Sequence, residues 1–175
     1  GKSEAVFLPF LALRGSVLPP RLIYSLPMRS LVNQLAERFK GYSQTAPSPS
    51  PVTVAAQHGE RPESVLFYAD AVVATIDQVI TSYACAPLTL GVRHGNIPAG
   101  AVATGFLVFD EVHTLDPERG LQSALILASR LKGMGIPFVI MTATLPTEAQ
   151  HVLQERLNLT SVEVDEKDIP TRKDR

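Results

Sequence analysis

The sequence has one cysteine, few charges and no long apolar run. Because Cys85 is the only cysteine among 175 residues, no intramolecular disulfide can form, and a reducing, cytoplasmic location is expected. We interpret Cys85 as a small buried apolar residue rather than a nucleophile. No apolar run reaches the roughly 18 residues of a membrane span, so no membrane partner is expected.

The chain is also poor in net charge. Charged residues make up 19% of the sequence and the net charge is −1, which excludes a strongly basic field of the kind that attracts nucleic acid. Phosphate can still be held by backbone amides and a few side chains. The hydrophobic content of 45% excludes a disordered chain and suffices for one domain. The start, GKSEAVFLPF, has neither a methionine nor a signal-peptide pattern, so we expect a piece of a longer protein.

Apolar runs alternate with amphipathic segments along the chain. Strands are predicted over residues 21–26, 52–57, 69–76, 104–110, 137–144 and 161–164. Helices are predicted after the first three residues and over residues 28–40, 77–84, 119–133 and 147–158, with Gly41 as the stop of the second. Residues 84–103, rich in glycine and proline, are expected to be irregular.

This alternation predicts the fold class. Strands that are apolar throughout are buried on both faces, so the pattern indicates an α/β domain, a three-layer parallel sheet with helices on both faces. Ligands of such folds bind at the carboxyl ends of the strands.

Two adjacent acids come after the most apolar of these runs. In FLVFDEVH, Asp110 and Glu111 stand directly behind Phe106–Phe109. One interpretation is a strand that ends at a polar loop, with the acids as a helix-capping pair. The other is a site that holds Mg²⁺ through Asp110 and orients and deprotonates water through Glu111.

The first three residues, Gly1, Lys2 and Ser3, match the end of the phosphate-binding loop G-x-x-x-x-G-K-[ST] that precedes a helix. In such a loop the lysine reaches the β- and γ-phosphates and the hydroxyl ligates Mg²⁺. We expect the chain to begin inside this loop, truncated at its N-terminal side. Taken alone, the three residues are better explained by a tag or by chance.

Five segments together resemble the superfamily 2 helicases of the DEAD/DEAH-box group. The match consists of GKSEA at the end of motif I, YSLPMRSLVNQ as motif Ia, VVATIDQVI as motif Ib, DEVH as motif II and MTATLP as motif III. The amino-acid sequences of motifs Ia, Ib and II are most similar to those in the helicase part of the CRISPR-associated helicase-nuclease of type I interference systems. The resemblance covers nearly the whole chain and implies a first RecA-like lobe of a P-loop NTPase, over residues 1–165, with 166–175 as a polar tail or linker.

The resemblance implies roles for the nucleotide site. Gly1, Lys2 and Ser3 would contact ATP, and Ser3 and Asp110 would hold Mg²⁺. Glu111 would act on the attacking water.

It also implies a coupling between nucleotide and nucleic acid. His113 would carry it, together with the hydroxyls of Thr142 and Thr144. From the residues alone, His113 is equally a surface histidine and the threonines are β-branched strand residues.

Three further residues, Arg29, Ser30 and Thr75, would touch the backbone of single-stranded DNA. Alternatively, Arg29 is an ordinary exposed residue at a helix start and Thr75 caps the helix after it. His58 falls near a His-Gly segment of the family, and we interpret it first as a loop histidine.

The resemblance also implies parts that the chain lacks. A second RecA-like lobe, with its arginine fingers, and a nuclease domain are expected in the parent protein, and a CRISPR surveillance complex as its partner. None of the four histidines is followed by aspartate, the pattern of the nuclease metal cluster. We therefore expect the isolated chain to bind nucleotide poorly and to be nearly inactive. Alternatives are another superfamily 2 RNA or DNA helicase, and a non-catalytic RecA-like docking module.

Overall fold

The computed structural model describes residues 2–46, 48, 50–88, 90–143, 151, 153–155 and 157–162. The chain divides into two units, Gly1–Thr144 and Leu145–Arg175. The first unit holds every helix and strand named below. The predicted helix over 147–158 and strand over 161–164 lie partly outside the described residues, and the predicted tail 166–175 lies wholly outside them.

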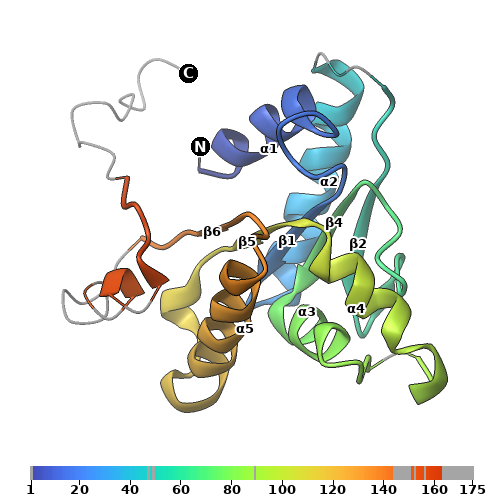
Figure 1. Ribbon diagram of the computed structural model, residues 1–175. Coiled ribbons are helices and arrows are strands. Elements are labelled where there is room, and N and C mark those ends of the chain that lie inside the picture. The colour runs from blue at the N-terminus through green and yellow to red at the C-terminus, as the bar shows by residue number, and fades with distance from the viewer. Residues whose placement is uncertain are drawn as a thin grey trace. The chain divides into compact units, whose positions relative to one another are not determined.

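One six-stranded sheet forms the centre of the first unit, in the order β3-β2-β4-β1-β5-β6 (Figure 1). Its strands are β1 (Leu22–Leu26), β2 (Val54–His58), β3 (Arg61–Pro62), β4 (Ala71–Thr75), β5 (Phe106–Phe109) and β6 (Phe138–Ile140). Every neighbouring pair is parallel except β2 and β3. The parallel arrangement of five of the six predicted strands is therefore confirmed. The antiparallel β3 was not predicted, because two residues carry no periodic pattern.

Helices cover both faces of this sheet. They are α1 (Lys2–Leu13), α2 (Arg29–Thr45), α3 (Ile76–Tyr83), α4 (Asn96–Ala103) and α5 (Gln122–Gly133). Figure 1 shows α1 and α2 on one side of the sheet and α3, α4 and α5 on the other. The three-layer α/β class predicted from the sequence is thus confirmed. Among the described residues, no helix combines the length and the apolar character needed to cross a bilayer.

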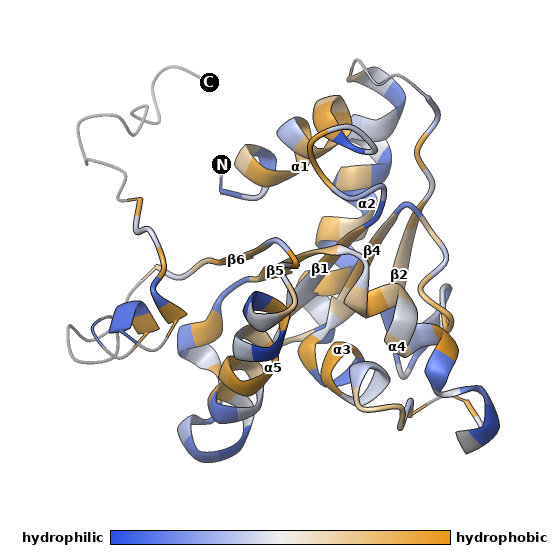
Figure 2. Ribbon diagram, viewed as in Figure 1, coloured by the Kyte–Doolittle hydropathy of each residue, from blue (hydrophilic) through white to orange (hydrophobic). Residues whose placement is uncertain are grey.

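The three central strands are buried along their whole length, as their almost wholly apolar sequence requires. Figure 2 shows the same pattern: the central strands are coloured as hydrophobic, and polar residues gather on the outer sides of the helices. On the α1–α2 face the core contains Phe7, Phe10, Tyr24 and Phe39, each without exposed surface.

Three local predictions were wrong. Helix α2 does not stop at Gly41 but continues to Thr45, because one glycine costs a helix only about 1 kcal/mol and Tyr42 packs against the core beyond it. Residues 84–103 are not wholly irregular, since they contain α4 and a 3₁₀ turn at Val92–His94. Pro98 is tolerated there because it lies in the first turn of α4, where a backbone N–H has no helical partner. Cys85 is exposed rather than buried.

Candidate active site

Asp110 lies directly beyond the end of β5 and is buried, with 5% of its surface exposed. Both of its carboxylate oxygens have protein donors. The backbone N–H of Glu111 donates to Oδ1 at 2.8 Å, and the hydroxyl of Tyr24 donates to Oδ2 at 2.6 Å. A carboxylate has about four acceptor sites, so each oxygen keeps capacity for one more partner.

Tyr24 connects Asp110 with the start of α1. Burial, and then the hydrogen bond to Asp110, raise the pKa of Tyr24, so its hydroxyl stays protonated and remains a donor. The Ser3 side chain lies close enough to the same hydroxyl to oppose this rise in its pKa. Ser3 and Asp110, predicted from distant parts of the sequence to share one metal, therefore lie near the same phenol. Lys2 is the exposed first residue of α1, next to Ser3, whereas Gly1 lies outside the described residues.

Glu111 has a left-handed backbone, with φ of 55° and ψ of 35°. Such a conformation is uncommon outside glycine and costs on the order of 1 kcal/mol or more. It is fixed from both sides: the Glu111 N–H bonds to Asp110, and the Glu111 carbonyl accepts the Thr114 N–H at 3.0 Å and the Thr114 hydroxyl at 2.8 Å. The chain thus turns sharply after the strand, which separates the directions of the two acids.

His113 lies between Glu111 and Thr142. Its Nδ1 lies 3.1 Å from the Thr142 hydroxyl and 3.4 Å from Glu111 Oε2. His113 and Thr142, which the resemblance gives a shared coupling role, are therefore neighbours in the fold, although they lie 29 positions apart in the sequence. The predicted partner Thr144 lies outside the described residues.

The three residues predicted to contact nucleic acid lie at the carboxyl ends of β1 and β4. These strands are adjacent, and Leu26 of β1 is in register with Thr75 of β4. Arg29 and Ser30 are exposed in the first turn of α2, and Arg29 forms an ion pair with exposed Glu60. Thr75 is 7% exposed and precedes α3 at the N-cap position, but its side chain makes no capping hydrogen bond.

His58 is not a loop histidine. It is the last residue of β2 and is 1% exposed. Burial lowers the pKa of His58, so the ring is neutral near pH 7. Because the Glu60 N–H donates to its Nδ1 at 3.3 Å, Nε2 carries the proton and donates to Asn33 Oδ1 at 2.9 Å. His58 therefore fastens the end of β2 to α2.

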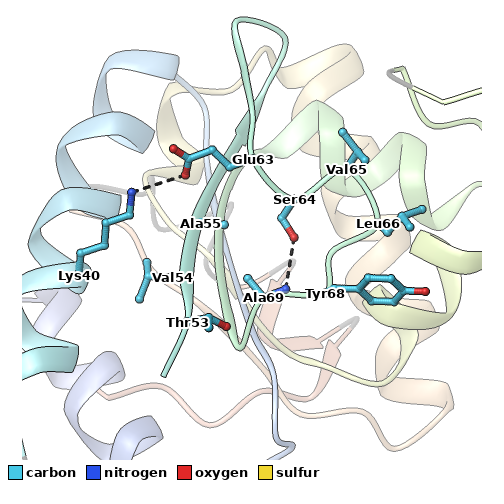
Figure 3. A pocket seen from close by; sticks show the side chains of 10 residues that line it. All are labelled: Lys40, Thr53, Val54, Ala55, Glu63, Ser64, Val65, Leu66, Tyr68 and Ala69. Atoms are coloured by element: carbon cyan, nitrogen blue, oxygen red, sulfur yellow. Dashed lines mark hydrogen bonds and ion pairs between the residues drawn. The ribbon is translucent and has the colours of Figure 1, made fainter. Parts of the chain in front are cut away.

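A cavity of about 620 Å³ lies apart from these residues (Figure 3). Its walls come from the start of β2, from Lys40 of α2 and from the segment 63–69, with Lys40 and Glu63 3.6 Å apart. The start of a parallel strand lies at the opposite edge of the sheet from the carboxyl ends. The cavity is thus no part of the candidate site.

Two residues that take part in the contacts of the candidate site, Tyr24 and Glu60, were not predicted from the sequence. Tyr24 was visible as a polar aromatic residue in a strand that is otherwise almost wholly apolar, but nothing in the sequence names Asp110 as its partner. Glu60 carried no signal, since an acid in a turn is usually only solvated. Both roles arise from contacts between distant segments.

Comparisons with known proteins agree with this geometry. The family model for the DEAD/DEAH box helicase matches residues 1–152. The CRISPR-associated helicase Cas3 of Thermoproteus tenax is 32% identical over 92% of this chain, which spans 31% of that relative's length.

Two solved structures share the fold. T. fusca Cas3-AMPPNP aligns with a TM-score of 0.66 and 23% identity, over 90% of this chain and 19% of the other. A hypothetical ATP-dependent RNA helicase from Sulfolobus tokodaii aligns with a TM-score of 0.63 and 18% identity, over 90% of this chain and 42% of the other. The order of the motifs, the sheet and the match over residues 1–152 lead to one conclusion: the chain belongs to the DEAD/DEAH box helicase family.

Proposed function

We propose that this chain is the first motor lobe of an ATP-dependent helicase that moves on single-stranded DNA in CRISPR interference. The observation that carries the proposal is the buried Asp110 carboxylate, which accepts a hydrogen bond from Tyr24, with Ser3 near the same phenol. The relatedness to Cas3 of Thermoproteus tenax supports the CRISPR context, and the T. fusca structures are of Cas3-AMPPNP, Cas3-ATP and Cas3-ADP. A surveillance complex is the proposed partner of the whole protein. A chain in the structure of a CRISPR RNA-guided surveillance complex, pre-nicking, has a similar fold.

The residues present fit a nucleotide with Mg²⁺. Ser3 and Asp110 offer oxygen ligands, and a site with one carboxylate suits Mg²⁺, which keeps several of its waters. When bound, Mg²⁺ would neutralise charge that develops on the phosphate oxygens. Lys2 would add its charge at the phosphates. The Asp110 carboxylate keeps acceptor sites that Tyr24 and Glu111 leave free. Through these sites it would contact Mg²⁺ directly or accept hydrogen bonds from the waters of the hydrated ion.

Glu111 is the group proposed to orient and deprotonate the attacking water. Its carboxylate lies outside the Tyr24–Asp110 contact and is 31% exposed, so water can reach it. The neighbouring His113 at 3.4 Å links that carboxylate to Thr142. A change at the γ-phosphate would thus be felt at the segment 141–143, which supports coupling between hydrolysis and the nucleic-acid side.

The carboxyl edge of β1 and β4 is the proposed DNA surface. The described side chains leave both adjoining helix N-termini uncapped: neither Met28 before α2 nor Thr75 before α3 makes a side-chain capping bond. Their backbone N–H groups and the helix dipoles therefore favour an anion there. Two such ends side by side suit successive phosphates of one strand, with Arg29 and Ser30 adding a charge and a hydroxyl.

The test of the proposed function is nucleotide hydrolysis by the full-length protein. We expect hydrolysis of ATP that requires Mg²⁺ and rises when single-stranded DNA is added. Stimulation by single-stranded RNA alone would favour a different superfamily 2 helicase. Absence of hydrolysis with either polymer would favour a docking module and overturn the proposal.

Arg29 and Glu60 give a second prediction. Arg29→Ala should weaken binding of single-stranded DNA and reduce the salt dependence by about 0.7 in the slope of log K against log salt. Glu60→Gln should tighten binding by about two- to fivefold, because Arg29 no longer has to leave an exposed ion pair. Fluorescence anisotropy at several salt concentrations measures both.

The matched control is Arg130→Ala, which removes an exposed arginine from the last turn of α5, away from the carboxyl ends of the strands. Equal effects of Arg29→Ala and Arg130→Ala would mean that Arg29 makes no specific contact with the DNA.

A further inference from the structure

Tyr24 is a polar residue in the centre of an apolar strand. It has no exposed surface, and a buried phenol needs a hydrogen-bond partner. Its partner is not a backbone carbonyl, the commonest acceptor in a sheet, but the carboxylate of Asp110 at 2.6 Å. This is the carboxylate that the proposed function assigns to Mg²⁺.

The register of the sheet explains why the two groups meet. Tyr24 in β1 lies opposite Val108 in β5. Asp110 comes two residues later and shares the face of Val108, because side chains alternate with a period of two. A tyrosine side chain is long enough to reach this diagonal position. A phenylalanine would fill the same volume but would leave Oδ2 without this donor.

The hydrogen bonds on Asp110 fix its orientation. Rotation of the carboxylate would break the bond from Tyr24 to Oδ2, the bond from the Glu111 amide to Oδ1, or both. The remaining acceptor sites then point in defined directions. Partners that hold a metal ligand in this manner typically change metal affinity or activity by about 10- to 100-fold when they are removed.

Aromatic packing holds the phenol itself. The ring of Phe39 lies edge-on to Tyr24, with centroids 5.5 Å apart, and stacks on Phe7 of α1 at 3.9 Å. Helix α1 also carries Ser3, whose side chain lies near the Tyr24 hydroxyl. The phenol is therefore the point at which the helix with the phosphate-loop residues meets the strand with the acids.

We propose that Tyr24 is a positioning residue, which holds the Asp110 carboxylate in the orientation that receives hydrated Mg²⁺ with the nucleotide. The proposal rests on the proposed function of the site. It assigns a role to a residue that would otherwise count as core, and it implies that the hydroxyl affects the metal-dependent part of nucleotide binding and not the metal-free part.

The experiment compares Tyr24→Phe with the unaltered full-length protein. A fluorescent ATP analogue is titrated in EDTA and in rising Mg²⁺, and the Mg²⁺ concentration that half-saturates hydrolysis is measured. We expect unchanged binding in EDTA, an increase of about tenfold in the Mg²⁺ needed, and recovery of much of kcat at high Mg²⁺.

Tyr42→Phe is the matched control. It also removes a phenol hydroxyl that donates to a carboxylate, that of Glu4 at 2.8 Å, and it should leave the Mg²⁺ requirement unchanged. A lower melting temperature of Tyr24→Phe with an unchanged Mg²⁺ requirement would show a purely structural role and overturn the inference.

A second variant protects the test against loss of folding. Tyr24→Phe alone leaves the buried Asp110 carboxylate without one of its hydrogen-bond donors. Asp110→Asn removes the negative charge of that side chain, so the double variant should fold. If Tyr24 acts through Asp110, adding Tyr24→Phe to Asp110→Asn should cause no further loss of Mg²⁺-dependent binding, whereas an independent role predicts an additive loss. An unaltered protein that binds nucleotide equally with and without Mg²⁺ would overturn the proposed function itself, and the role of Tyr24 with it.

Discussion

Glu111→Gln is expected to slow ATP hydrolysis by about 10²- to 10⁴-fold while nucleotide binding is retained. The amide keeps the size and the hydrogen-bonding oxygen of the carboxylate but cannot take a proton from water. Because the left-handed backbone of Glu111 is held by bonds to Asp110 and Thr114, the substitution should not move the main chain. Single-turnover hydrolysis with saturating single-stranded DNA measures the loss, and titration of a fluorescent ATP analogue measures binding.

The matched control is Glu118→Gln in the turn Pro117–Leu121, an exposed acid further along the chain. It makes the same chemical change and should leave hydrolysis as it is. Normal hydrolysis by Glu111→Gln would show that the water is activated elsewhere. Loss of Mg²⁺-dependent binding along with hydrolysis would instead place Glu111 at the metal and reverse the proposed division between the two acids.

The sequence predicted the layers of this fold because its strands are nearly continuous apolar runs. The segment Phe106–Phe109 is buried on both sides, as such a run requires, and the acids after it lie at the strand end where they were expected. Local patterns failed where helix signals are weak. Helix α4 contains Pro98 and Gly100, and tertiary burial of Ala101 and Val102 compensates for their poor propensity.

The sequence indicated which residues make up the candidate site but not which of them form hydrogen bonds with one another. Asp110 and Ser3 were predicted from their sequence motifs and His113 from the family resemblance, whereas the bond from Tyr24 to Asp110 depends on β1 lying beside β5. Strand order is a property of the whole sheet, and no local pattern encodes it. The same reason hid the pairing of Arg29 with Glu60, which requires the end of β2 to come near the start of α2.

Phe39→Ala is expected to cost about 3–5 kcal/mol of stability, among the largest effects that one substitution can have. Phe39 has no exposed surface, stacks on Phe7 with an angle of 5° between the rings, and meets Tyr24 edge-on. Its removal leaves a cavity between α1, α2 and β1 that these rigid elements cannot close. A domain with the usual stability of about 5–15 kcal/mol would lose a large share of it.

Hydrogen–deuterium exchange of the full-length protein measures this loss within the domain. Backbone amides of β1 and α2 should exchange at least about 100-fold faster in Phe39→Ala, since each difference of about 1.4 kcal/mol corresponds to a factor of ten. Leu8→Ala on α1 is the control: Leu8 is 44% exposed, and its truncation should change exchange little. Because Phe39 also supports the ring of Tyr24, Phe39→Leu, which keeps the core filled but not with an aromatic ring, should retain most of the stability and still raise the Mg²⁺ requirement. Exchange in Phe39→Ala no faster than in Leu8→Ala would mean that the aromatic cluster does not stabilise the lobe, and would remove the support assigned to Tyr24.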